Sequence, residues 1–197
     1  MKKAILAAAM VMAMGSTSAM AADQGGQLNF HGLVSATTCS KVVSTSRGDE
    51  STDGNIYLRT ATPGDITTEV ADTTYGALEE PFTIILNCKD ASEVVGGTTV
   101  AKLSMVSSFG NTKGTLNNDT NLTAAGMAAA KNVNIAIHDA DKKTLMKVDG
   151  ADVHDATFDT SKVATYHFVA SYVKAVLADD VTPGHVTTNA MYTFTYE

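Results

Sequence analysis

The most constraining feature of this sequence is the alternation of apolar and polar residues that runs to its last positions. Near the end of the chain, Met191, Thr193 and Thr195 separate a second set, which is Ala190, Tyr192, Phe194 and Tyr196. In a β-strand successive side chains point to opposite faces, so a period of two places the second set on one face. The ending therefore predicts a strand with one aromatic-rich face, and this strand has no partner strand after it.

Similar runs occur along the rest of the chain, separated by clusters of Gly, Asn and Asp that favour turns. Residues 40–80 are polar and predict only one small strand, at 56–58. Residues 124–131 look helical, but the stretch is short and interrupted by Gly126, so we expect a loop or a single turn. Many short strands, each with one apolar face, predict an all-β sandwich. The remaining predicted strands are 82–88, 101–105, 132–138 and 166–172.

The first 21 residues have the pattern of an export signal. Lys2 and Lys3 precede an apolar stretch at 4–14, and Ala19-Met20-Ala21 matches a small-x-small cleavage site. The apolar run is too short to span a bilayer as a helix, which argues against an uncleaved anchor. We therefore expect residues 1–21 to be removed and the remainder to be exported.

Export determines how the cysteines are interpreted. Cys39 and Cys88 are the only two in the chain, and an even number in an oxidising compartment predicts one structural disulfide. A redox-active pair is the alternative, but the spacing is not C-x-x-C.

Charge and motif content exclude several classes of function. The chain has 14 basic and 21 acidic residues, and a net charge of −7 argues against nucleic-acid binding. No catalytic motif, phosphate-binding glycine loop or cofactor motif is present, so we expect no enzyme activity and no cofactor. The five histidines have no metal-binding spacing, and His138-Asp139 and His154-Asp155 look like polar residues of strand ends and loops. Asn118 and Asn121 match the glycosylation pattern, which is frequent by chance in a Thr-rich chain.

A second apolar strand is expected at the beginning of the exported part. Leu28 and Phe30 share one face of a predicted strand at 27–30, directly after residues 22–26. A sandwich that ends in an apolar strand must cover that strand's edge or aggregate, and this segment is a candidate cover. It could fold back on its own domain or pair with another copy of the chain. Leu28 and Phe30 could also be ordinary core residues of a complete domain.

The same residues resemble the pilin domains of chaperone–usher fimbrial subunits over nearly the whole exported chain. The ending is the most specific part, because Gly184 is fourteenth from the C-terminus and Tyr196 is penultimate, as in that family. The other matching segments are Phe30–Val34 followed by Cys39, Phe82–Cys88, Asn132–Asp139 and Phe168–Tyr172.

The resemblance implies an incomplete immunoglobulin-like β-sandwich that lacks its last strand and is completed by a donor strand. It implies a signal peptide at 1–21, a donor-strand extension at 22–32 and a pilin domain at 33–197. The donor residues would be Gln24, Gly26, Leu28 and Phe30. The acceptor groove and chaperone-binding strand would involve Gly184, Ala190, Tyr192, Phe194 and Tyr196.

The resemblance also implies partners and a location. A periplasmic chaperone would deliver the subunit to an outer-membrane usher, where neighbouring copies or other pilus subunits join head to tail. The product would be a surface fimbria that supports adhesion. A minor adaptor or tip subunit that binds a host ligand is the first alternative, although a two-domain adhesin would need a longer chain. An exported β-sandwich carrier or enzyme is the second.

Overall fold

The computed structural model describes residues 26–33, 39–48, 50–121 and 126–197, with residues 26–33 described as backbone. The predicted signal peptide and Gln24 lie outside these residues. Within them, the chain is built from β-strands and turns and contains no α-helix, so the all-β prediction is confirmed. Residues 126–131 form turns and isolated bridges instead of a helix, and 124–125 lie outside the described ranges.

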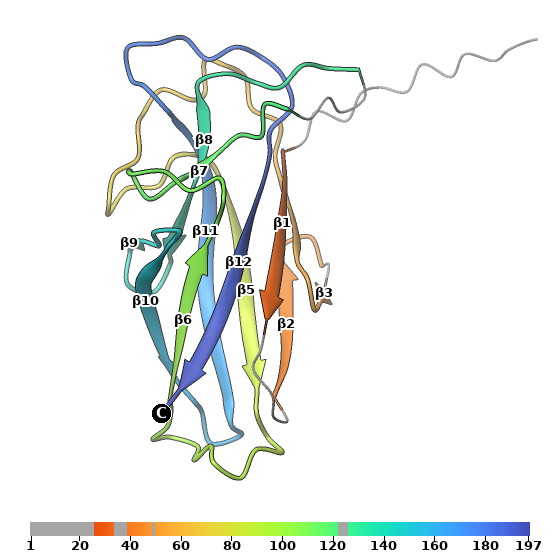
Figure 1. Cartoon of the computed structure of the whole chain (residues 1–197), viewed down its shortest axis with the longest axis vertical. Helices are drawn as coiled ribbons and strands as arrows, with labels where there is room; N and C mark the ends of the chain where they lie inside the picture. The colour runs from red at the N-terminus through yellow and green to blue at the C-terminus, as the bar shows by residue number, and fades with distance from the viewer. Residues whose placement is uncertain (1–25, 34–38, 49, 122–125) are drawn as a thin grey trace, which may run out of the picture.

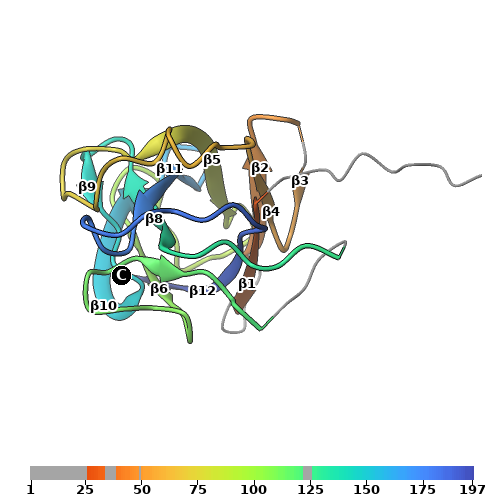
Figure 2. The ribbon, with the colours of Figure 1, turned by 90° about the horizontal axis from the view of Figure 1, so that it is seen from above.

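The strands form two sheets that pack face to face as a sandwich (Figure 1, Figure 2). The front sheet has the order β10-β6-β12-β1-β4, and the back sheet has the order β3-β2-β5-β11-β8-β7, with β9 paired to β8. The strands are β1 (Gly26–Leu33), β2 (Ser40–Thr45), β3 (Glu50–Ser51), β4 (Asn55–Leu58), β5 (Ala77–Asn87), β6 (Val100–Val106), β7 (Leu116–Asn117), β8 (Val133–Asp139), β9 (Thr144–Leu145), β10 (Asp149–Thr157), β11 (Val163–Lys174) and β12 (Thr187–Tyr196).

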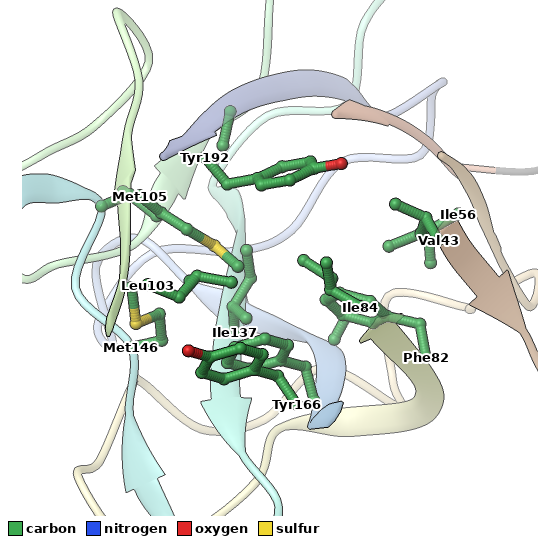
Figure 3. Close-up of a cluster of buried hydrophobic side chains, with 14 of the residues drawn as sticks. Val43, Ile56, Phe82, Ile84, Leu103, Met105, Ile137, Met146, Tyr166 and Tyr192 are labelled. Atoms are coloured by element: carbon green, nitrogen blue, oxygen red, sulfur yellow. The ribbon is translucent and has the colours of Figure 1, made fainter. Parts of the chain in front are cut away.

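The core lies between the two sheets and is built from the alternating residues of their central strands. Ile84 of β5 and Tyr166 of β11 face Leu103 of β6 and Tyr192 of β12 across the sandwich (Figure 3). The four side chains are no more than 3% exposed. Each large side chain that is fully buried in this way stabilises the fold by about 1.5–3 kcal/mol. The period-two pattern therefore succeeded where strands lie in the middle of a sheet.

Besides three strands of two residues, β3, β7 and β9, two longer strands were not predicted from the sequence. β2 lies in the stretch expected to be mostly polar, and Val43 is its only fully buried residue. β10 is the edge strand of the front sheet, and among its residues only His154 is fully buried. A strand that buries one side chain has no apolar alternation to detect, because its stability comes from pairing with residues far away in the sequence.

A disulfide joins Cys39 to Cys88. Cys39 precedes β2 and Cys88 follows β5, and these two strands pair in antiparallel register from Ser40 opposite Asn87. The bond therefore closes one end of a strand pair in the back sheet. It also fixes the chain a few residues after the end of β1.

A buried carboxylate–imidazole pair joins the two sheets at the edge opposite β4. His154 Nδ1 of β10 donates a hydrogen bond of 2.6 Å to Asp139 Oδ2 of β8, and both side chains are at most 7% exposed. The backbone N–H groups of Asp141 and Lys142 donate to Asp139 Oδ1. Burial by itself would raise the pKa of Asp139, but the hydrogen bonds from His154 and the two backbone amides lower it below its usual value. The sequence-based view of His154 as a loop residue was therefore wrong, since it lies within β10 and is buried.

Because of this pair, we expect the folded chain to lose stability in acid. Because the pKa of Asp139 is lower in the folded chain than in the unfolded chain, its stabilising effect is present above about pH 4 and is lost as the pH falls through the folded pKa. Asp139→Asn should cost about 1–3 kcal/mol at pH 7 and should flatten the fall in stability between pH 5 and 2, measured by denaturant unfolding at each pH. The control is Asp141→Asn, which removes the exposed partner of His167. Equal pH profiles for the two variants would contradict the prediction.

Candidate functional site

The predicted donor segment lies beside the C-terminal strand of its own chain. β1 runs parallel to β12, from Gln27 opposite Thr187 to Leu33 opposite Thr193. On its other side it pairs antiparallel with β4, with Gly26 opposite Leu58. In Figure 1 the red β1 accordingly lies beside the dark blue β12. Of the two arrangements that the sequence left open for this segment, the described chain adopts the one in which it folds back on its own domain.

The slot that β1 occupies has two walls that do not pair with each other. β12 uses its other edge to pair with β6, from Met191 opposite Val106 to Tyr196 opposite Ala101. β4 is the edge strand of the front sheet, and among the described strands of that sheet β1 is its partner. Without β1, the backbone N–H and C=O groups on the facing edges of β12 and β4 would therefore have no partner strand to form hydrogen bonds with.

The predicted acceptor residues of β12 line the inner side of this wall. Ala190, Tyr192 and Phe194 are at most 4% exposed, and Met191 between them is 54% exposed. Tyr196 is partly buried, and its hydroxyl donates a hydrogen bond of 3.3 Å to Glu93 Oε1. The alternation predicted for the ending is therefore present, with the apolar face directed into the core.

Tyr192 connects this wall to the segment before β4. Its hydroxyl donates a hydrogen bond of 3.2 Å to the carbonyl of Thr52, and Lys41 Nζ lies 5.3 Å from the centroid of its ring. Burial, helped by the negative charge of Asp53, raises the pKa of Tyr192 to about 12. The hydroxyl therefore stays protonated as a donor at physiological pH.

The start of β12 is held by a buried asparagine. Asn118 Nδ2 donates to the carbonyls of Ala130 and His185, at 2.9 and 3.1 Å, and Asn118 Oδ1 accepts from the N–H of Thr187. Asn118 is 8% exposed, and its amide is used within the fold, so it is not available as a glycosylation acceptor. The sequence carried no signal for this role beyond the motif match.

Gly184 lies in the turn before β12, against the backbone of residues 128–130. A Cβ atom at this position would come closer than 3.0 Å to the backbone of Ala128 and Ala130. Any other residue would therefore have to displace main chain that is hydrogen-bonded to His185. The glycine expected from the sequence is required by close approach of two backbone segments.

A small cavity lies next to this turn, at the end of the slot where β1 begins. Its volume is about 50 Å³, and its lining includes Ile66, Val133, Tyr172, Gly184 and Val186. Because Gln27 pairs with Thr187, a strand extended beyond the start of β1 along β12 would pass Val186 and Gly184. The cavity is therefore placed to receive a side chain from such an extension.

The described residues lack two other kinds of site. They contain no cluster of three or more His, Cys, Asp or Glu side chains arranged to bind a metal ion. They also contain no helix with the length and apolar character needed to cross a membrane.

Two solved structures can be aligned with this chain at low sequence identity. The CupB6 tip adhesin from Pseudomonas aeruginosa aligns at 10% identity and a TM-score of 0.44, covering 66% of this chain and 38% of that one. The chain thus spans well under half the length of that adhesin. An antigen and type I fimbria protein of Burkholderia pseudomallei aligns at 20% identity and a TM-score of 0.40, covering 87% of this chain and 94% of that one.

No curated protein matches the sequence. The family model described as "Fimbrial protein" matches residues 29–197, which include β1, both cysteines and the whole of β12. Proteins of this family are structural and not enzymatic, and they assemble with other subunits into pili on the cell surface. The chain therefore belongs to the fimbrial protein family and is a pilus subunit.

Proposed function

We propose that this chain polymerises by donor-strand exchange, in which the N-terminal segment of one subunit takes the position of β1 in the next. The observation that carries the proposal is that a terminal segment fills a slot between two strands, β12 and β4, that do not otherwise pair. If residues 1–21 are removed as expected, β1 lies close to the new N-terminus and can leave such a slot without unthreading any other strand. Insertion of an extended segment beside an open strand edge is a general mode of recognition, of which chaperone–pilin complexes are a standard example.

The energetics of the slot favour a strand of this composition. A donated strand forms backbone hydrogen bonds with β12 on one side and β4 on the other. Leu28 and Phe30 lie two residues apart and so share one face, and full burial of each contributes about 1.5–3 kcal/mol. By the same alternation, Gly26 and Gln24 of a donated strand would continue this face towards the small cavity beside Gly184. A small side chain such as that of Ala22 is suited to a cavity of this size.

Self-docking and exchange compete for the same slot. When the strand belongs to the same chain, its effective concentration is in the millimolar range, so an isolated subunit fills its own slot. A periplasmic chaperone that occupies the slot would keep the subunit available, and the outer-membrane usher would present it to the next N-terminal segment. The contact between tail and slot is heterologous and does not close on itself, so repetition gives a filament. The filament would reach the cell surface through the periplasm and support adhesion.

The polymer formed this way should resist detergent. We expect samples from cells that produce the chain with its chaperone and usher to run as a ladder on detergent gels before strong heating, and as one monomer band afterwards. The reason is that each junction buries a whole strand, which makes its dissociation slow at room temperature. A control sample without the usher should show monomer only. A single monomer band in unheated samples that contain the usher would contradict the proposal.

A further inference from the structure

The second wall of the slot needs support from outside its own sheet. β4 has four residues, and its ladder in the front sheet is with β1. If β1 leaves during exchange, as the proposed function requires, this ladder is lost. Ile56 and Leu58 are buried and remain packed in the core, but Asn55 and Tyr57 between them are exposed. A wall built from two buried side chains would be free to shift unless its ends are fixed.

A buried carboxylate lies close to one end of β4. Glu80 of β5 is 4% exposed, and its carboxylate accepts a hydrogen bond from the hydroxyl of Ser46. Arg47 Nε lies 3.8 Å from Glu80 Oε1, and Arg59 Nε lies 4.0 Å from Glu80 Oε2. Arg47 and Arg59 are the only arginines in the sequence, and both converge on this one carboxylate. We refer to Ser46, Arg47, Arg59 and Glu80 as the Glu80 cluster.

Arg59 fixes the end of β4 to the back sheet through two further contacts. Its Nη2 donates a hydrogen bond of 2.8 Å to the carbonyl of Glu79 in β5. Its own carbonyl accepts a hydrogen bond of 3.2 Å from the hydroxyl of Tyr172 in β11. Arg59 directly follows Leu58, which pairs with Gly26 at the start of β1. The contacts with the back sheet are therefore independent of β1 and sit at the end of the slot where β1 begins.

Because the Glu80 carboxylate is buried, the loss of either arginine partner should be costly. Removing a partner from a buried charge is costly, because the charge is then left without compensation in a medium of low polarity. The side chains of Arg47 and Arg59 are about half exposed, at 47% and 55%, so each can be changed without opening the core. The cluster thus favours one position of β4 whether or not the slot is filled.

We propose that the Glu80 cluster is a positioning device that holds β4 as a preformed second wall, so that an incoming strand meets two fixed edges. This inference rests on the proposed function for its consequence, but the anchoring itself is a property of the single chain. A binding site that is ordered before its ligand arrives pays less conformational entropy on binding. Loss of the cluster should therefore make β4 mobile and should shorten the lifetime of an inserted strand.

Hydrogen exchange read by mass spectrometry on the exported chain tests the anchoring. Arg59→Met and Glu80→Gln should each speed exchange of the amides in residues 55–58 at least tenfold, with a smaller change in β8 and β11. The matched control is His154→Gln, which disturbs the opposite edge of the sandwich. If the amides of β4 change no more than in this control at equal loss of global stability, the proposal is overturned. Arg59→Lys, which keeps the charge but not the guanidinium, should give an intermediate effect.

A labelled synthetic peptide with the sequence of residues 22–33 tests the consequence. Because β1 of the same chain would fill the slot, the peptide is bound to chains that lack residues 22–30. We expect it to dissociate from the Arg59→Met form of this truncated chain at least tenfold faster than from the truncated chain without a substitution, with the His154→Gln form close to the latter. Dissociation within twofold of the control would overturn the role in strand capture. If the peptide fails to enter the chain that lacks residues 22–30 and is otherwise unaltered, whose slot is open, the proposed function fails, and the exchange measurement still decides whether the cluster anchors β4. Should Glu80→Gln not fold, the exposed Arg59→Met carries both measurements.

Discussion

A chain that lacks residues 22–30 should form no polymer. The deletion removes most of β1, and with it the strand that pairs with both β12 and β4. The truncated subunit has nothing to donate, but its own slot is open and can still accept a strand. We therefore expect it to bind chaperone, to be captured at one end of a growing filament, and to stop further addition there. The measurement is the ladder on unheated detergent gels, with the truncated chain produced alone and together with the full chain.

Single substitutions within β1 test the same assignment as the deletion does. Leu28→Asp or Phe30→Asp places a charge on the face expected to be buried, whereas Asn29→Ser alters a position of opposite alternation. The aspartate variants should reduce polymer by at least tenfold, and Asn29→Ser should leave it unchanged. Adding the peptide of residues 22–33 to the truncated chain should restore its resistance to unfolding, and a scrambled peptide should not. Normal polymer from the truncated chain would overturn the donor assignment.

Replacing both cysteines with serine should lower the free energy of unfolding by about 4 kcal/mol. Cys39 and Cys88 are 49 residues apart, and a cross-link that closes a loop of this length restricts the unfolded chain by about that amount. For a domain of this size the melting temperature should fall by about 10 °C. The measurement is denaturant unfolding of the double variant beside the unaltered chain, with and without a reducing agent.

The reducing agent supplies the internal control for this prediction. The unaltered chain should become as unstable as the double variant once it is reduced, and the double variant should not respond. Because the bond fixes the chain just after β1, we also expect the variant to give less chaperone-bound subunit in the periplasm. An unchanged unfolding midpoint would show that the bond adds little to the stability of the fold.

The sequence predicted the central strands well because their signal is local. β8 lies within one residue of the run that the alternation indicated, 132–138, and β5, β6, β11 and β12 extend the predicted runs by a few residues. Each of these strands has buried partners on one face, so apolar residues recur every second position. The edge strand β10 has no such face, and the short strands β7 and β9 are too brief to carry a pattern.

Only the part of the candidate site that lies within one segment could be predicted from the sequence. The inward residues of β12 and the close approach at Gly184 could be proposed from the ending of the chain, because they lie within one segment. β4 was expected as a small strand, but its role as the second wall was not, because its pairing partner is separated from it in the sequence. The same holds for Asp139 and His154, which the sequence suggested were polar strand-end and loop residues and which the fold buries against each other.

By itself, the amino-acid sequence determined that this protein is an all-β chain with an apolar C-terminal strand, one pair of cysteines and a short apolar segment near its start. These follow from periodicity and composition, which are properties of neighbouring residues. Tertiary structure alone decided that β1 lies parallel to β12 and that the only two arginines meet at Glu80. Such contacts join residues from distant parts of the chain, so they arise only when the two sheets close on each other, and no local pattern encodes them.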